Sequence, residues 1–154
     1  MAQYRAVNPL ASVDAAYIAG LIDGEGTITL SRKHAADKRH LAISISNTEE
    51  VLLDFVLRSV GAGKITRKKT TKAHLSPSLT YAIWNRQALS LLVQIEPFLR
   101  SYKRARARLV LEHYLHLTPR NGKYTPEIAA ERQRFESTLL GIRANSTEKP
   151  RAMA

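Results

Sequence analysis

Two carboxylates flanked by glycines are the residues of this chain best suited to chemistry. Asp23 and Glu25 alternate with Gly24 and Gly26 in the run Asp-Gly-Glu-Gly. Carboxylate oxygens are hard ligands that bind divalent cations such as Mg²⁺, and glycine permits close backbone approaches that other residues resist. The run follows an apolar stretch, residues 15–22. The sequence therefore places two acids at the end of an apolar segment.

The apolar segment itself is predicted to be a helix with one face free of large side chains. Ala16, Gly20 and Gly24 recur every four residues, a spacing that puts them on one helix face. Such a face lets a second backbone approach closely. We expect a helix contact between two copies of the chain, which holds an acid beside its symmetry mate. The alternative is an ordinary buried helix that ends in glycine.

The charge of the chain indicates a polyanionic partner. It has 24 lysines and arginines against 13 acids, a formal net charge of +11. Residues 31–74 hold ten basic side chains and four acidic ones, and residues 100–108 hold five basic side chains and no acid. These two basic zones occupy strand-like and loop-like segments rather than one basic amphipathic helix, which favours nucleic acid over a membrane surface.

Composition excludes several other classes of protein. The chain has no cysteine, so disulfides, thiolate ligands and cysteine nucleophiles are ruled out. No apolar run approaches the ~20 residues that span a bilayer, and the N-terminus lacks the layout of a signal peptide. We expect an intracellular protein with one domain, residues 1–144, and a flexible tail, residues 145–154. The five histidines show no metal-ligand spacing, and Trp84 is expected in the core with the six tyrosines.

Periodicity predicts the element order α-β-β-α-β-β-α-α-α, an α+β fold. Helices are expected over residues 12–24, 48–61, 86–95, 103–117 and 126–142, and strands over 27–31, 40–46, 63–68 and 79–84. Ser12, Thr48 and Thr125 are the expected helix caps. Two hairpins then form one four-stranded antiparallel sheet, with helices on one face and the other face open.

Residues 18–26, Ile-Ala-Gly-Leu-Ile-Asp-Gly-Glu-Gly, resemble the LAGLIDADG motif of homing endonucleases. The resemblance implies a mixed αββαββα core and a site-specific endonuclease encoded by a mobile intron or intein. Such an enzyme hydrolyses phosphodiesters with Mg²⁺, or another divalent cation such as Mn²⁺, and makes a staggered double-strand cut in a long pseudo-palindromic site. The motif occurs once, and relatives with two copies act as monomers.

A single copy therefore implies a homodimer on double-stranded DNA, with no membrane and no organic cofactor. The alternative is a relative that kept the fold and binds DNA or RNA without cleaving it, as an intron maturase or a transcription regulator.

The open face of the sheet is the expected DNA-binding surface, because two-stranded ribbons fit the major groove. Alternation places polar or small side chains there, and the resemblance adds two more from the fourth strand; the set is Thr27, Thr29, Ser31, His40, Ala42, Ser44, Lys64, Thr66, Lys68, Thr80 and Ala82. Basic side chains at the strand ends and in the loops are expected to contact phosphates: Arg32, Lys33, Arg39, Arg67, Lys69 and Lys72.

The resemblance also assigns the residues at the end of the first helix. It implies that Glu25 binds the metal together with the backbone carbonyl of Gly24. Asp23 is expected to have a structural role at the helix end, where it joins Ala16 and Gly20 in the dimer interface.

Two further catalytic residues follow from the resemblance. Asn47, at the end of the second strand, would orient water near the metal; alternatively it is a turn residue before Thr48. Lys103, after the Pro-Phe-Leu run, would stabilise phosphate charge or order solvent as a point charge. One inserted residue blurs the register there, so Arg100 and Arg104 remain alternatives.

Overall fold

The computed structural model describes residues 6–67 and 77–144. Along the chain lie α1 (Ser12–Glu25), β1 (Gly26–Ser31), β2 (His40–Asn47), α2 (Glu50–Val60), β3 (Lys64–Arg67), β4 (Leu79–Trp84), α3 (Asn85–Ile95), the 3-10 helix η1 (Glu96–Phe98), α4 (Tyr102–His113) and α5 (Pro126–Gly141). The order of helices and strands predicted from the sequence is confirmed, with η1 added between α3 and α4.

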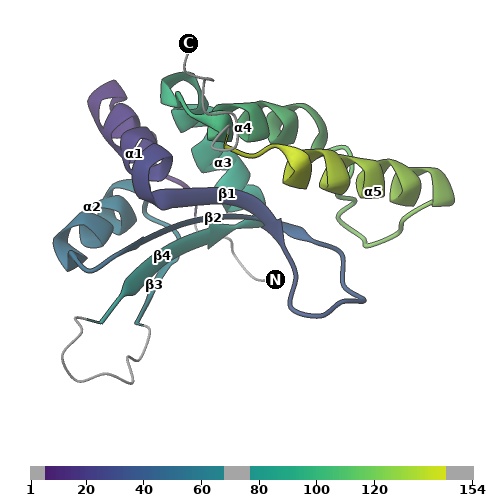
Figure 1. Cartoon of the computed structure of the whole chain (residues 1–154), viewed down its shortest axis with the longest axis horizontal. Helices are drawn as coiled ribbons and strands as arrows, with labels where there is room; N and C mark the ends of the chain where they lie inside the picture. Colours follow the sequence, from purple (N-terminus) through teal and green to yellow (C-terminus); the bar gives the residue numbers. More distant parts are fainter. Residues whose placement is uncertain (1–5, 68–76, 145–154) are drawn as a thin grey trace, which may run out of the picture.

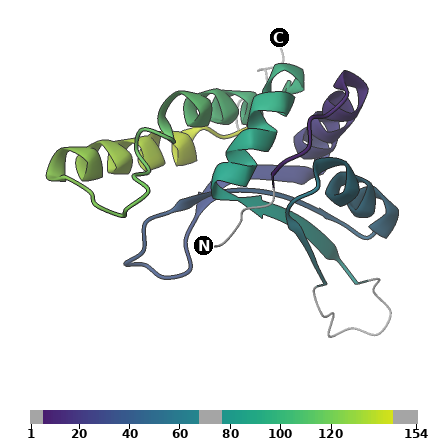
Figure 2. The same ribbon diagram turned by 180° about the vertical axis from the view of Figure 1, so that it is seen from behind.

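The four strands form one antiparallel sheet in the order β1-β2-β4-β3. The register pairs Ile28 with Ile43 and Ile45 with Tyr81, so the apolar sets of neighbouring strands share a face. The sheet is curved, with the helices on its convex side and no helix on the other side (Figures 1 and 2). The predicted open face is therefore present.

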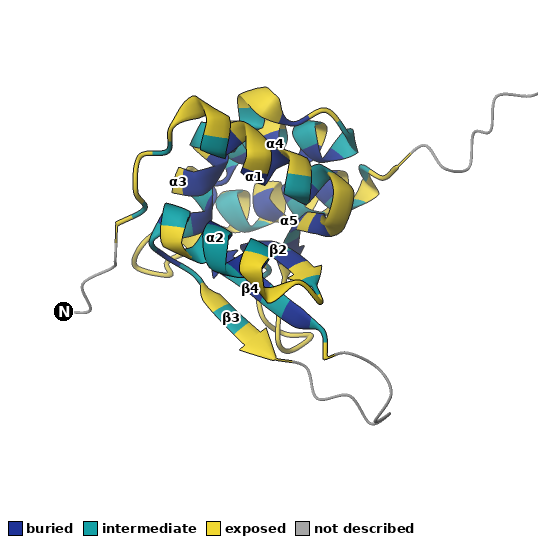
Figure 3. Ribbon diagram, turned by 90° about the vertical axis from the view of Figure 1, so that its left-hand side faces the viewer, coloured by how far each residue is buried: buried dark blue, intermediate teal, exposed yellow. Residues whose placement is uncertain are grey.

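The core lies between the sheet and the helices. Strands β1 and β4 bury every second residue, which is the alternation that a half-covered sheet requires, and β2 follows it except at Ala42. Helix α1 buries Ile18 and Ile22 against this layer, and α3 adds Leu91 and Leu92. Strand β3 is largely exposed (Figure 3), since only Ile65 packs against the core.

Several predicted boundaries are wrong by a few residues. Helix α1 does not stop at Gly24 but continues through Glu25, because the Gly26 amide still donates to the carbonyl of Ile22. Neither Ser12 nor Thr48 is a cap: Ala11 precedes α1, and Glu49 precedes α2.

At the C-terminal side, α4 ends at His113 rather than at residue 117, and its N-terminus is capped by Ser101 Oγ, which accepts from the Lys103 amide at 3.2 Å. The Thr125 cap of α5 is confirmed, with Oγ1 accepting from the Ile128 amide at 3.2 Å. The expected tail, residues 145–154, lies outside the described residues. Among the helices that the structure describes, none has the length and apolar character needed to cross a bilayer.

Candidate active site and DNA-binding face

Glu25 is the last residue of α1 and its side chain is exposed. The register pairs the next residue, Gly26, with Ile45 of β2, which brings the end of β2 beside Glu25. There the Asn47 side-chain amide donates a hydrogen bond to Glu25 Oε2, while Asn47 Oδ1 accepts from the Glu49 amide at 2.8 Å. Asn47 thus contacts the candidate acid and holds the turn into α2, as its alternative assignment predicted, while its expected role in orienting water near the metal stays a prediction.

Gly26 explains why the acidic run ends in glycine. A Cβ on Gly26 would lie 2.7 Å from the Ile22 Cα and 3.0 Å from the Ser44 carbonyl oxygen, closer than backbone atoms tolerate. Only glycine lets the chain leave α1 and enter β1 without moving either neighbour. Glu25 is therefore fixed between a helix end and the edge of a packed strand.

Asp23 faces the connection between η1 and α4. Its Oδ2 accepts from the Arg100 amide at 2.8 Å, and its Oδ1 accepts from the Ser101 amide at 3.1 Å and the Ser101 hydroxyl at 2.5 Å. Burial raises the pKa of this carboxyl, but the hydrogen bonds from Ser101 and Arg100 and the charge of Lys103 outweigh burial and hold the pKa below its ordinary value of 3.8. These contacts support the structural role expected for Asp23.

An Asp23→Asn variant is expected to lose part of the pH dependence of stability. Since the carboxyl has a depressed pKa in the folded state, it stabilises the fold above its unfolded pKa and loses that contribution as the pH falls through the folded pKa. Urea unfolding at pH 7 and pH 3 should show a smaller change in free energy for the variant than for the wild type. Ser101→Ala, which removes one donor, should give an intermediate change; an unchanged profile in Asp23→Asn would contradict this prediction.

Lys103 is buried, at 7% exposure, beneath the end of α1. Its Nζ donates to the carbonyls of Ile22 at 2.7 Å and Asp23 at 2.9 Å, two of the last four carbonyls of the helix. Burial lowers the pKa of Lys103, the charge of Asp23 opposes this, and the charge of Arg106 adds to the lowering. The lysine is thus placed to fix the end of α1, which carries Glu25.

The basic zone at residues 100–108 is mostly engaged within the protein. Arg106 is 9% exposed and donates to the carbonyls of Ile28 and Ile142. Arg104 and Arg108 both form ion pairs with Glu96, at 3.3 and 2.9 Å. The hydrogen bond from Arg108 lowers the pKa of Glu96 most, partial burial opposes it, and Arg104 adds to the lowering, so the pKa lies below its ordinary value. Much of the charge that indicated nucleic acid therefore stabilises the α3–α4 connection instead.

The open face carries most of the side chains predicted for it. Exposed or half-buried there are Thr27, Thr29, Ser31, His40, Ser44, Lys64, Thr66, Thr80 and Ala82. Ser46 Oγ and Thr80 Oγ1 share a hydrogen bond of 2.8 Å across β2 and β4. Arg32 and Lys33 are exposed in the loop after β1, Arg39 is half-buried, and Arg67 pairs with Glu50 at 3.5 Å. Lys68, Lys69 and Lys72 lie outside the described residues.

Two predictions for this face are wrong. Ala42 is buried, at 9% exposure, because its cross-strand neighbours on either side are the larger Thr29 and Trp84. Trp84 is not in the core. It is 43% exposed and, by the alternation of β4, lies on the same face of the strand as Thr80 and Ala82. Alternation alone could have placed Trp84 on the open face, since Leu79, Tyr81 and Ile83 are the buried set.

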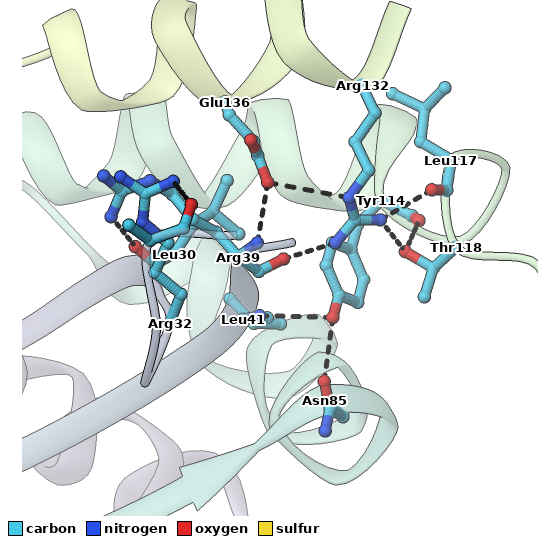
Figure 4. A network of polar contacts seen from close by, with 11 residues as sticks. Leu30, Arg32, Arg39, Leu41, Asn85, Tyr114, Leu117, Thr118, Arg132 and Glu136 are labelled. Atoms are coloured by element: carbon cyan, nitrogen blue, oxygen red, sulfur yellow. Dashed lines mark hydrogen bonds and ion pairs between the residues drawn. The ribbon is translucent and has the colours of Figure 1, made fainter. Parts of the chain in front are cut away.

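The loop between β1 and β2 is anchored to α5 by a buried arginine, which no motif or spacing in the sequence predicts (Figure 4). Arg132 is 1% exposed; it donates to the carbonyls of Arg39 and Leu117, the latter at 2.6 Å, and to Thr118 Oγ1 at 2.8 Å. Glu136 accepts from the Arg39 amide at 2.9 Å and lies 3.6 Å from Arg132 Nε. Helix α5 thus contacts both the amide and the carbonyl of Arg39.

The small-residue face of α1 is uncovered. Ala16, Gly20 and Gly24 are exposed, and a Cβ on either glycine would meet no heavy atom within 4 Å. Val13, beside them, is 78% exposed. In residues 6–67 and 77–144 no three His, Cys, Asp or Glu side chains are grouped so that they could hold a metal ion.

Comparison with known proteins identifies the class to which this fold belongs. The homing endonuclease I-CvuI in complex with its target superposes with a TM-score of 0.69 at 18% identity, covering 86% of this chain and 83% of that one. The archaeal intron-encoded endonuclease I-Vdi141I, complexed with DNA, superposes with a TM-score of 0.57 at 17% identity, and the match covers 86% of each chain. I-LtrWI, bound to target DNA, superposes with a TM-score of 0.59 at 18% identity. The match covers 91% of this chain but 49% of I-LtrWI. The fold is that of the homing endonucleases.

The sequence identifies the family. The LAGLIDADG-like domain family matches residues 12–134, most of the chain, and the protein belongs to that family. No curated protein matches the sequence. The resemblance seen in residues 18–26 is therefore confirmed for family and fold.

Proposed function

We propose that this protein is a homodimeric, site-specific DNA endonuclease that hydrolyses phosphodiesters with a divalent cation. The observation that carries the proposal is the exposed carboxylate of Glu25, held by Asn47 at the end of a helix whose outer face is uncovered. The family and the DNA complexes of similar structures support it.

Mg²⁺ is the expected cation, because carboxylate and carbonyl oxygens suit a hard ion that keeps part of its water. The Glu25 carboxylate and the exposed backbone of Gly24 provide oxygen donors of this kind. When bound, the ion would supply an activated water and charge stabilisation at the phosphate. Asn47 would orient solvent at this place, and Lys103, through the carbonyls of Ile22 and Asp23, would keep Glu25 in position.

The homodimer is supported by the uncovered face of α1, where Ala16, Gly20 and Gly24 are exposed. A close contact between two copies of α1 through Ala16 and Gly20 would bring two Glu25 carboxylates together. Asp23, which holds the α4 connection at the same helix end, would lie at the edge of that contact.

Gly20→Leu is expected to weaken the dimer strongly and leave the fold intact. A Cβ on Gly20 meets no atom of its own chain, and leucine favours a helix over glycine by ~0.5–1 kcal/mol. At a close contact the added side chains should cost about 1–3 kcal/mol at each symmetry-related position, so the dimer should weaken by roughly 100-fold. Sedimentation velocity measures the change. Gly141→Leu, at a second open glycine, is the matched control, and a dimer dissociation constant unchanged in Gly20→Leu would contradict the α1 interface.

The open face would bind the DNA. Its hydroxyls, Lys64 and His40 are suited to base edges in the major groove, while Arg32, Lys33 and Arg39 at the far end would contact phosphates. Affinity should then depend strongly on salt.

Cleavage of a randomised duplex library tests the proposed function directly. The protein is incubated with the library in Mg²⁺ or in EDTA, and the ends produced are sequenced. The expected result is Mg²⁺-dependent, staggered ends at one long, pseudo-palindromic sequence. Selective binding without cleavage would instead identify a silent relative that acts as a maturase or a regulator.

A further inference from the structure

Trp84, the sole tryptophan of the chain, is accessible on the open face of the sheet. Large aromatic side chains are usually mostly buried, and this one is 43% exposed. Pairing between β3 and β4 ends at Ala82, so Trp84 lies beyond β3 and has a paired strand neighbour, Ala42, on one side only. The indole ring is therefore open to a ligand that lies on this face.

A pocket of about 680 Å³ opens beside Trp84. It is lined by the start of β2, the end of β4, the first turn of α3 and the connection between α4 and α5. The lining includes the basic side chains Arg86 and Arg120 and the imidazole of His40, and no acidic residue. Its charge therefore suits an anion.

Hydrogen bonds hold the walls of this pocket in place. Tyr114, 1% exposed, donates to Asn85 Oδ1 at 3.0 Å and accepts from the Leu41 amide at 3.1 Å (Figure 4). Asn85 has φ 55°, a left-handed conformation that asparagine tolerates better than most residues. Arg86 Nη2 donates to the Thr118 carbonyl at 3.4 Å, which ties α3 to the α4–α5 connection. The pocket is thus formed by anchored elements.

The pocket continues the proposed DNA-binding face at the end of the sheet away from Glu25. His40 pairs with Ser31, and the exposed Arg32 and Lys33 follow directly. A DNA strand lying along β1 and β2 would pass from Glu25 toward the pocket. Guanidinium groups match phosphate oxygens in a planar fork, and an indole ring offers an apolar face to a sugar or base.

We infer that this pocket is a subsite for the sugar–phosphate backbone of DNA at the outer end of the target, with Arg86 and Arg120 on the phosphate and Trp84 on the deoxyribose. The inference rests on the proposed function, since it places a DNA strand on the open face. It extends the interface beyond the sheet to α3 and the α4–α5 connection.

The fluorescence of Trp84 tests the inference, because no other tryptophan contributes. A 30-bp duplex of random sequence is titrated into the full chain at low salt, and Trp84 emission is followed together with the anisotropy of labelled DNA. Emission should change in step with binding. Arg120→Gln should weaken binding at least about 3-fold and reduce the salt slope by roughly one, while Arg134→Gln, on the exposed side of α5, should change neither. Trp84→Phe should bind more tightly than Trp84→Ala.

The possible failures are distinct. If anisotropy reports binding while Trp84 emission stays constant, or if Arg120→Gln behaves as Arg134→Gln does, the subsite is overturned and the proposed function survives. If the wild-type chain binds no DNA at all, both are overturned. Because Trp84 and Arg120 are exposed, circular dichroism should show their variants folded, so loss of binding would report the contact rather than the fold.

Discussion

A Glu25→Gln variant should bind DNA as tightly as the wild type and cleave it about a thousand-fold more slowly, a loss on the order of 4 kcal/mol in transition-state stabilisation. Glutamine keeps the shape of the side chain, and its oxygen can still accept from Asn47. It lacks the negative charge that a divalent cation requires of its ligand. Single-turnover cleavage of the selected target measures the rate, and gel-shift titration in Ca²⁺ measures the affinity.

The matched control for this variant is Glu49→Gln, which removes an exposed carboxylate next to Asn47 at the start of α2. It should cleave at close to the wild-type rate. Full cleavage by Glu25→Gln would contradict the assignment of the metal-binding acid. Equal losses in both variants would mean that net charge, rather than a specific ligand, controls the reaction.

Arg132→Met should lower the free energy of unfolding by about 3–5 kcal/mol, the cost of breaking a buried ion pair by removing one partner. The variant leaves the carbonyls of Arg39 and Leu117 without their donor and leaves Glu136 without its cation. For a domain that is stable by ~5–15 kcal/mol, this is a large fraction. Urea unfolding followed by circular dichroism measures the change.

Two further variants separate the causes of this loss. Arg134→Met, on the exposed side of the same helix, should stay within about 0.5 kcal/mol of wild type. Adding Glu136→Gln to Arg132→Met should recover part of the loss, because the unpaired carboxylate is then removed. A small effect of Arg132→Met would show that the contacts between α5 and Arg39 contribute little to stability.

The sequence predicted the sheet well because its signals are local. Alternation in residues 27–31 and 40–46 identifies the buried set of two strands, and the structure buries Ile28, Leu30, Leu41 and Ile43. The same alternation wrongly predicts that Ala42 is exposed. Its exposure depends on the larger side chains of its neighbours on the two adjacent strands, Thr29 and Trp84. Helix ends were less predictable, since Gly24 could end a helix but Gly26 does so here.

Charge was the least reliable guide to the DNA-contacting residues, because the sequence does not distinguish a solvated basic side chain from a buried one. The sequence predicts a phosphate contact for Arg32 and places Arg106 in a basic zone that favours nucleic acid. The fold leaves Arg32 exposed beyond β1 and places Arg106 against the carbonyls of Ile28 and Ile142. The sequence does not indicate what Arg132 contacts, since its hydrogen-bond partners are 14 to 93 residues away in the chain.

The sequence by itself determined the family, the element order and the identity of the candidate acid. A motif of nine consecutive residues and the periodicity of strands and helices depend only on residues that are close together in the chain. Only the tertiary structure decided what Asp23, Asn47 and Lys103 contact. Those outcomes depend on strand register and on contacts between segments as much as 81 residues apart, such as Lys103 with Ile22. No local pattern in the sequence encodes such a pairing.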